Sequence, residues 1–141
     1  MDGSSPLVPK PLVVAQAGIG YWGPNLLRNL VGNPRCRVKT AVDFSEERRN
    51  FVSRLYPGVN ATADLEAIFS DKEIDAVVIA TPASTHFEMA TRCLEAGKHV
   101  LVEKPFVPGL RRSRRSRKPH EMRVAWLWRR TPSFLMTRCV S

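Results

Sequence analysis

This sequence lacks the long apolar segment that a membrane-spanning helix needs, which is a run of roughly 20 residues. Its start, MDGSSPLVPKP, shows no basic segment followed by an apolar one, so we expect no secretory signal. It has only three cysteines, an odd number spaced far apart. Such cysteine usage predicts a reducing compartment and no disulfide framework, with Cys36 and Cys93 as core thiols. These absences favour a cytoplasmic protein.

The first three quarters of the chain also carry no net charge. Of the 22 basic and 13 acidic residues, 12 of each lie in residues 1–106. The net charge of +9 therefore arises entirely within residues 107–141, which hold ten Lys or Arg and one Glu. A basic arm of this kind is typical of binding to nucleic acid or a membrane surface.

The most informative stretch that is present is LVVAQAGIGYWGPNLLRNL, residues 12–30. Its apolar start predicts a strand, which turns through a GxGxxG sequence, residues 18–23, into a helix opened by Pro24. In such a turn the second glycine lets a pyrophosphate approach the backbone, and free N–H groups at the helix start face the phosphates. Asp43 follows a second apolar run, 20 positions after Gly23. That is the context which the dinucleotide-binding fingerprint requires.

Strands and helices are predicted to alternate through the rest of the first 106 residues. The expected strands span residues 12–17, 38–42, 59–61, 74–80 and 99–102. The expected helix starts are Pro24, a Ser45 cap, an Asp64 cap and a capping box over residues 85–88. Parallel strands need right-handed crossovers. The predicted fold class is therefore α/β: a Rossmann-type doubly wound parallel sheet, incomplete, with its ligand crevice at the carboxyl ends of the strands.

The chain divides into three predicted parts. Residues 1–10 form a flexible leader, residues 11–106 the dinucleotide-binding domain, and residues 107–141 a disordered or irregular basic tail without a recognisable domain.

Three segments resemble the N-terminal NAD(P)-binding domain of the Gfo/Idh/MocA oxidoreductase family, the relatives of glucose–fructose oxidoreductase and inositol dehydrogenase. They are GIGYWGPNLLRNL, AVDFSEERR and IDAVVIATPASTHFEMATRCLEAGKHVLVEKP. The resemblance covers about residues 11–106, and its markers are the glycine turn, a TPxxxH loop and an EKP triplet. The YWGPN variant is similar to members that act on nucleotide sugars. The resemblance implies hydride transfer between a nicotinamide and a sugar, inositol or nucleotide-sugar substrate.

The resemblance also implies roles for individual residues. Lys104 matches the family's catalytic lysine, which helps to polarise and protonate the reacting sugar oxygen, and Glu103 would position it. Asp43 would bind the adenosine ribose, which favours NAD as cofactor, while Arg48 and Arg49 keep NADP as the alternative. No metal is expected. The expected cofactor-binding residues are Gly18, Ile19, Gly20, Tyr21, Trp22, Gly23, Asp43, Thr81, Pro82, His86 and Glu103.

Each of these assignments has a purely structural alternative. The glycines would then be ordinary turn residues and Asp43 a helix-capping acid. Lys104 would be a surface lysine, His86 a helix residue that touches nothing, and Trp22 a side chain packed on the sheet.

Residues 107–141 do not resemble the family's second domain, which completes the substrate pocket. We favour a change of reading frame near Phe106, because the Arg- and Ser-rich text corresponds, one base out of step, to a Glu-rich helix. The alternatives are a disordered tail and an arm that binds nucleic acid, with Trp126 and Trp128 stacking on bases.

The expected partners are a dinucleotide and, in the full-length family, a sugar or nucleotide-sugar. A membrane partner is not expected, nucleic acid is disfavoured, and the family's homo-oligomer is doubtful for this chain. Whether the chain is itself an enzyme stays open, because without a substrate domain we expect weak or no turnover. A nucleotide-binding module without catalysis is the alternative function.

Overall fold

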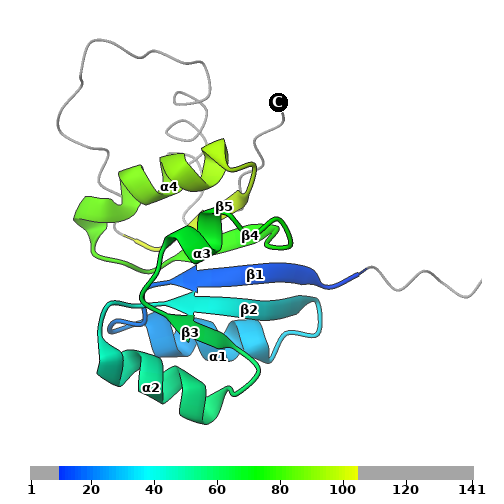
Figure 1. Ribbon diagram of the computed structural model, residues 1–141, viewed down its shortest axis with the longest axis vertical. Coiled ribbons are helices and arrows are strands. Elements are labelled where there is room, and N and C mark those ends of the chain that lie inside the picture. The colour runs from blue at the N-terminus through cyan, green and yellow to red at the C-terminus, as the bar shows by residue number, and fades with distance from the viewer. Residues whose placement is uncertain (1–9, 105–141) are drawn as a thin grey trace, which may run out of the picture.

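The computed structural model describes residues 10–104, so the tail and nearly all of the expected leader lie outside the described residues. Within this range, five strands alternate with four α-helices and one 3₁₀ helix (Figure 1). In chain order the elements are β1 (Leu12–Ala17), α1 (Gly23–Val31), β2 (Cys36–Val42), α2 (Glu46–Leu55), β3 (Asn60–Thr62), α3 (Glu66–Phe69), β4 (Ala76–Ile79), η1 (Ala83–Thr85), α4 (His86–Glu95) and β5 (His99–Val102).

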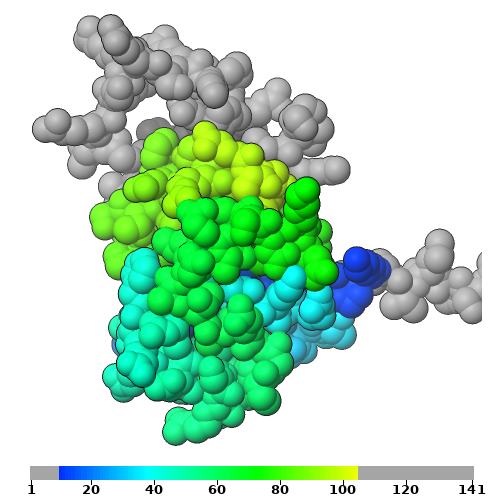
Figure 2. Space-filling model, viewed as in Figure 1, coloured from blue at the N-terminus to red at the C-terminus, as the bar shows by residue number. Residues whose placement is uncertain are grey.

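The five strands form one sheet in the order β3-β2-β1-β4-β5, and every neighbouring pair is parallel. β1 is the central strand, and little of it is visible from outside in the view of Figure 2. The order of the strands reverses between β1 and β4, because the chain first builds outward to β3 and then returns to the other side of β1. This arrangement confirms the predicted doubly wound parallel sheet.

Helices cover both faces of the sheet, with α1 and α2 on one face and α3 and α4 on the other (Figure 1). Successive residues of β1 supply the two layers, since side chains alternate between the faces of a strand. Val14 packs in a cluster with Leu26 and Leu30 of α1, whereas Ala15 packs in a cluster with Met89 of α4. The near-continuous apolar character of β1 and β4 follows from this double coverage.

The predicted strands agree with the structure in position, with differences at some ends. β1 and β5 begin and end at the predicted residues. β2 starts two residues earlier than predicted, β3 lies one residue later, and β4 is shorter at both ends. At its start, Asp75 bonds to Val13 through its N–H (2.9 Å) and also through its side chain, whose Oδ2 accepts the Val13 N–H at 2.9 Å.

The predicted Ser45 cap is present, whereas the Asp64 and capping-box predictions were wrong. The N-cap position of α3 is Leu65, and Asp64 lies one residue before it. The Ser45 hydroxyl accepts the Arg48 N–H at 3.4 Å, and Asp64 Oδ1 accepts the Glu66 N–H at 2.9 Å. The capping box over residues 85–88 does not form. Thr85 ends the 3₁₀ helix η1, and its hydroxyl donates to the Pro82 carbonyl at 2.8 Å. The Thr85 backbone has φ −99° and ψ −9°, which is helical, whereas a capping residue normally has an extended backbone whose side-chain oxygen can accept an N–H of the helix. No helix within residues 10–104 has the length and apolar character that crossing a membrane would require.

Candidate functional site

The carboxyl ends of parallel strands meet at one edge of the sheet, where ligands of such folds bind. The order of the strands places Asp43 first, after β2, and then the glycine turn, residues 18–23, after β1. Thr81–Pro82 follows β4, and Glu103–Lys104 follows β5. The span from β2 to β5 is three strand spacings, roughly 14 Å. The structure therefore brings every segment of the predicted site to the same edge.

The first and last glycines of the turn sit where a side chain would not fit. Gly18 has a φ of +93°, and a Cβ there would lie 2.6 Å from the Ala80 carbonyl oxygen. The turn after β1 thus packs directly against the connection after β4. A Cβ at Gly23 would lie 2.9 Å from the Gly18 carbonyl oxygen, so a glycine is required for α1 to start this close to β1.

Three consecutive backbone N–H groups of the turn, those of Gly20, Tyr21 and Trp22, have no hydrogen-bond acceptor among residues 10–104. They lie immediately before α1, whose N-terminus carries the positive end of the helix dipole. Pro24 adds no competing donor in the first turn of that helix. Free N–H groups at a helix N-terminus form a binding site for an anion such as a phosphate.

Asp43 lies next to this turn and is only 9% exposed. Its Oδ2 accepts the Ile19 N–H at 2.7 Å, and its Oδ1 accepts the Ser45 N–H at 2.8 Å. The guanidinium of Arg48 lies 3.5 Å from Oδ2. Asp43 therefore has part of the structural role given as its alternative, because it holds the residue that caps α2. Each carboxylate oxygen still has a second lone pair for a ligand hydroxyl.

The side chains of the turn differ in how far they are exposed to solvent. Ile19 is buried in the core against Leu27 and Val52, so only its backbone belongs to the site. Tyr21 and Trp22 are 89% and 55% exposed, and their rings meet edge to face at 5.4 Å. Trp22 is therefore not packed away on the sheet, and both rings are available at the edge where the free N–H groups lie.

His86 lies beneath the connection after β4 and does not face solvent. It is 2% exposed, and its Nε2 lies 2.6 Å from the Thr81 carbonyl oxygen, which requires a proton on Nε2. Its Nδ1 has no partner within residues 10–104. His86 thus supports the backbone of Thr81, and direct contact between His86 and a cofactor stays a prediction.

Glu103 and Lys104 end the described part of the chain at the far side of the same edge. The Glu103 N–H donates to the Ile79 carbonyl at 3.0 Å, which continues the pairing of β5 with β4 by one residue. Lys104 is exposed. The structure places Lys104 at the predicted edge, and its catalytic role stays a prediction.

Gln16 was not predicted as a functional residue, yet its side chain contacts the glycine turn. Its Nε2 donates to the carbonyls of Gly18 (3.0 Å) and Gly23 (2.8 Å). The sequence signal that could have identified Gln16 is its polar amide inside an otherwise apolar strand, LVVAQA.

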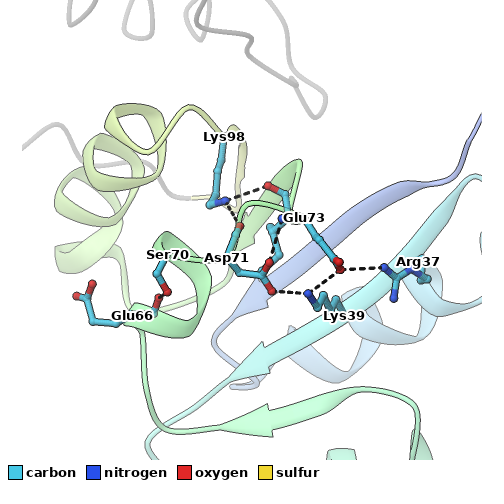
Figure 3. Close-up of polar contacts among 8 residues, drawn as sticks. Arg37, Lys39, Glu66, Ser70, Asp71, Glu73 and Lys98 are labelled. Carbon is cyan, nitrogen blue, oxygen red and sulfur yellow. Dashed lines mark hydrogen bonds and ion pairs between the residues drawn. The ribbon is translucent and has the colours of Figure 1, made fainter.

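The opposite edge of the sheet carries a separate network of charges (Figure 3). Lys39 of β2 bonds to Asp71 at 2.6 Å and to Glu73 at 2.7 Å. Bonding to Lys39 lowers the pKa of both carboxyl groups, and bonding to Asp71 and Glu73 raises the pKa of Lys39. Lys98 is buried nearby and donates to the backbone carbonyls of Asp71 and Ile74. This network joins the turn after α3 to β2 and β5 and lies away from the predicted site.

The fold and the site at the carboxyl edge define a dinucleotide-binding Rossmann domain. A family model described as "Oxidoreductase family, NAD-binding Rossmann fold" matches residues 12–118. The chain belongs to this family, the Gfo/Idh/MocA oxidoreductases, which confirms the predicted family and its NAD(P)-binding class. The match extends beyond residue 106, where the resemblance was expected to end.

Individual relatives agree with this assignment. Inositol 2-dehydrogenase of Rhodococcus erythropolis is 37% identical over 97 residues, which are 67% of this chain and 28% of that protein. The structure of GenD2 from gentamicin A biosynthesis in complex with NAD has a TM-score of 0.65 and 35% identity, covering 70% of this chain and 28% of GenD2.

The structure of a KijD10 variant, a 3-ketoreductase from Actinomadura kijaniata in complex with TDP-benzene and NADP, has a TM-score of 0.64 and 27% identity. It covers 70% of this chain and 31% of KijD10. The chain therefore spans less than a third of the length of these relatives.

Proposed function

We propose that this chain is the dinucleotide-binding part of an NAD(P)-dependent dehydrogenase acting on a sugar, inositol or nucleotide-sugar. One observation carries the proposal: three consecutive N–H groups without an acceptor within residues 10–104 stand at the start of α1, beside the buried carboxylate of Asp43. An anion and a vicinal diol, as found in a dinucleotide, match these two neighbouring groups.

The order of the strands gives the proposed orientation of the cofactor. The pyrophosphate would lie on the N–H groups of residues 20–22, and the adenosine ribose would bind Asp43 on the β2 side. The nicotinamide would then extend past Thr81–Pro82 toward Lys104 on the β5 side. This path crosses the point between β1 and β4 where the strand order reverses, which is where such folds bind their ligands.

NAD is the cofactor we propose, with NADP as the alternative. The carboxylate of Asp43 would repel a 2′-phosphate. Arg48 opposes this effect, because its positive charge would attract the 2′-phosphate. Its guanidinium lies 3.5 Å from Asp43 Oδ2 and 3.9 Å from the position that a Cβ on Gly20 would take. The relatives support both cofactors, since GenD2 was crystallised with NAD and KijD10 with NADP.

The reaction we propose transfers a hydride between a carbinol carbon of the substrate and C4 of the nicotinamide. In the oxidising direction the hydroxyl proton would pass to the neutral amine of Lys104, which Glu103 would position, and in the reducing direction the Lys104 ammonium would return it. The inositol dehydrogenase and the TDP-ligand complex among the relatives support a polyol or nucleotide-sugar substrate. We propose that the chain alone turns over weakly or not at all, and that it resides in the cytoplasm.

Calorimetric titration of the 141-residue chain with NAD⁺, NADH and NADP⁺ tests the proposal. We expect saturable binding of at least one of them. A folded chain that binds none of them at about millimolar concentration would contradict the proposal. Even a Kd of about 1 mM corresponds to a binding free energy of roughly 4 kcal/mol, which this titration would detect. A module without catalysis would bind the cofactor and show no turnover even when the remaining part of a full-length relative is added.

Binding of nucleic acid is not favoured by the family match, and the basic residues concerned lie outside the described part of the chain. Salt-dependent retention on DNA that disappears when residues 107–141 are deleted would support it.

A further inference from the structure

Gln16 lies at the centre of the sheet and is completely buried. Its strand neighbours are Ala41 of β2 and Val78 of β4, and all other residues of β1 are apolar. Its Oε1 has no hydrogen-bond partner among the described residues. A buried acceptor without a partner costs stability, which an apolar side chain of the same size would avoid. Core packing alone therefore does not account for Gln16.

The nitrogen of the same amide is fully used. Its two hydrogens go to the Gly18 carbonyl at 3.0 Å and the Gly23 carbonyl at 2.8 Å. Gly18 is the first residue of the glycine turn and Gly23 is the last, where α1 begins. One planar amide thus joins both ends of the turn and fixes the distance between them.

The bond to Gly18 also fixes the direction of a peptide plane. In a trans peptide the carbonyl and the following N–H point in opposite directions. The Gly18 carbonyl points to Gln16, and the Ile19 N–H of the same peptide points to Asp43 Oδ2 at 2.7 Å. This plane is therefore held at both ends, and the free N–H groups of residues 20–22 follow directly after it.

We infer that Gln16 is a positioning residue, whose amide presets the three free N–H groups of the turn for an anionic ligand. Which ligand benefits rests on the proposed function, in which it is the pyrophosphate of a nicotinamide dinucleotide. Donors that are already ordered bind more tightly, because less conformational freedom is lost on binding. The orphaned Oε1 is then the structural consequence of placing an amide where its two hydrogens are needed.

The test compares two variants of the 141-residue chain. Gln16→Met keeps the length of the side chain and removes both donors together with the orphaned acceptor. Val14→Ala is the control, since Val14 lies two residues earlier on the same face of β1, packs against α1, and has an apolar side chain that makes no hydrogen bond to the turn. We expect Gln16→Met to weaken cofactor binding about tenfold. The unfolding midpoint should change little, because removing the buried orphaned acceptor offsets the loss of the donor to the Gly18 and Gly23 carbonyls.

The control should behave in the opposite way, with a lower unfolding midpoint and a dissociation constant within about twofold of the parent chain. Equal cofactor affinity in Gln16→Met and the parent chain would overturn the inference. So would a loss of affinity in Val14→Ala as large as that in Gln16→Met, because it would make the effect one of general stability.

A second readout needs no ligand and separates this inference from the proposed function. The ¹⁵N order parameters of the Gly20, Tyr21 and Trp22 amides should fall in Gln16→Met and stay unchanged in Val14→Ala. If the parent chain binds no nucleotide, the proposed function fails, and this measurement alone decides the role of Gln16. Unchanged order parameters in Gln16→Met would then overturn it.

Discussion

The backbone N–H of Ile19 donates to the carboxylate of Asp43 at 2.7 Å, and this bond joins the turn after β1 to the end of β2. The same carboxylate holds the N–H of Ser45, the residue that caps α2. Asp43 therefore organises two neighbouring connections before any ligand is present. The proposed role in binding ribose adds to this structural role, since the carboxylate is oriented by the bonds that it already makes.

Replacing Asp43 should lower both stability and cofactor affinity. Asp43→Ala leaves the N–H groups of Ile19 and Ser45 without their acceptor, and we expect a loss of about 1–3 kcal/mol in the free energy of unfolding. Asp43→Asn keeps one acceptor oxygen and should lose less. Both variants should bind NAD more weakly, and Asp43→Asn should improve the ratio of NADP to NAD affinity because the negative charge is gone. Urea titration and calorimetry measure the two effects, and an Asp43→Ala chain as stable as its parent would contradict the structural part.

Two alanine substitutions in the glycine turn should separate folding from binding. Gly18→Ala combines a φ of +93° with a Cβ 2.6 Å from the Ala80 carbonyl oxygen, so we expect a stability loss above about 2 kcal/mol. At Gly20 the nearest atom to an added Cβ is a nitrogen of Arg48 at 3.9 Å, so the chain should fold normally. The methyl group would nevertheless stand where a phosphate must approach the backbone, and NAD affinity should fall about tenfold or more.

Gly58→Ala is the matched control for this pair, because nothing lies within 4 Å of its added Cβ. It should change neither the unfolding midpoint nor the dissociation constant. Normal NAD binding by Gly20→Ala would show that the phosphate does not lie against this part of the backbone.

Arg48 should matter for NADP more than for NAD. Its guanidinium lies beside both Asp43 and Gly20. In the proposed orientation of the cofactor, the 2′-phosphate of NADP would lie there. We expect Arg48→Ala to weaken NADP binding about fivefold or more, as the loss of one charged contact predicts. NAD affinity should stay nearly constant. Arg54→Ala, at the exposed end of the same helix, is the control, and an equal effect of Arg48→Ala on both cofactors would show that Arg48 does not discriminate between them.

The parts of this fold that the sequence predicted are those with a local signal. β1 and β5 were located correctly because each is an apolar run that ends at a turn, and the Ser45 cap was located because its partner lies three residues away. The capping box at Thr85 had the same kind of local pattern and failed. Thr85 belongs to the 3₁₀ helix η1, so its backbone is helical and not extended as a capping residue requires.

Contacts between distant segments had no such signal. The polar character of Gln16 was visible, but nothing in the sequence indicates that its amide bonds to Gly18 and also reaches the start of α1. The family motif predicted that His86 lies along the cofactor, which stays a prediction, but it did not indicate that the ring is buried and bonds to the Thr81 carbonyl. Sequence spacing identified the glycine turn and Asp43, and only the folded chain shows which side chains hold them in place.

The charge network at the opposite edge predicts how stability depends on pH. Asp71 and Glu73 have a pKa below the ordinary value in the folded chain, so their contribution is complete above the ordinary carboxyl range and is lost as the pH falls through the lowered pKa. Lys39 has a pKa above 10.5, so its contribution is complete below that value and is lost at higher pH. The network should therefore stabilise the fold between about pH 5 and pH 10.

Lys39→Met should remove this contribution. The difference in urea midpoint between the parent chain and Lys39→Met should be largest near neutral pH and shrink toward about pH 3, where the carboxyl groups gain protons in both chains. Lys72→Met is the control, since Lys72 makes no ion pair within residues 10–104. A difference that stays constant across the acid range would mean that Lys39 acts through packing and not through its charge.

Cys93 should be nearly inert in the folded chain. Cys93 lies on α4 and its thiol is buried between this helix and the sheet. Burial raises the pKa of the thiol to about 12, so at pH 8 only about one thiol in ten thousand is the reactive thiolate. Cys36 is half-buried at the start of β2 and should be alkylated first.

Mass spectrometry of peptides after brief treatment with iodoacetamide resolves each cysteine separately. We expect the Cys36 peptide to be labelled at least about ten times faster than the Cys93 peptide, and in denaturant the two rates should converge, since only the fold protects Cys93. Equal rates in the native chain would show that α4 opens readily from the sheet, because Cys93 is reached only when that helix moves away.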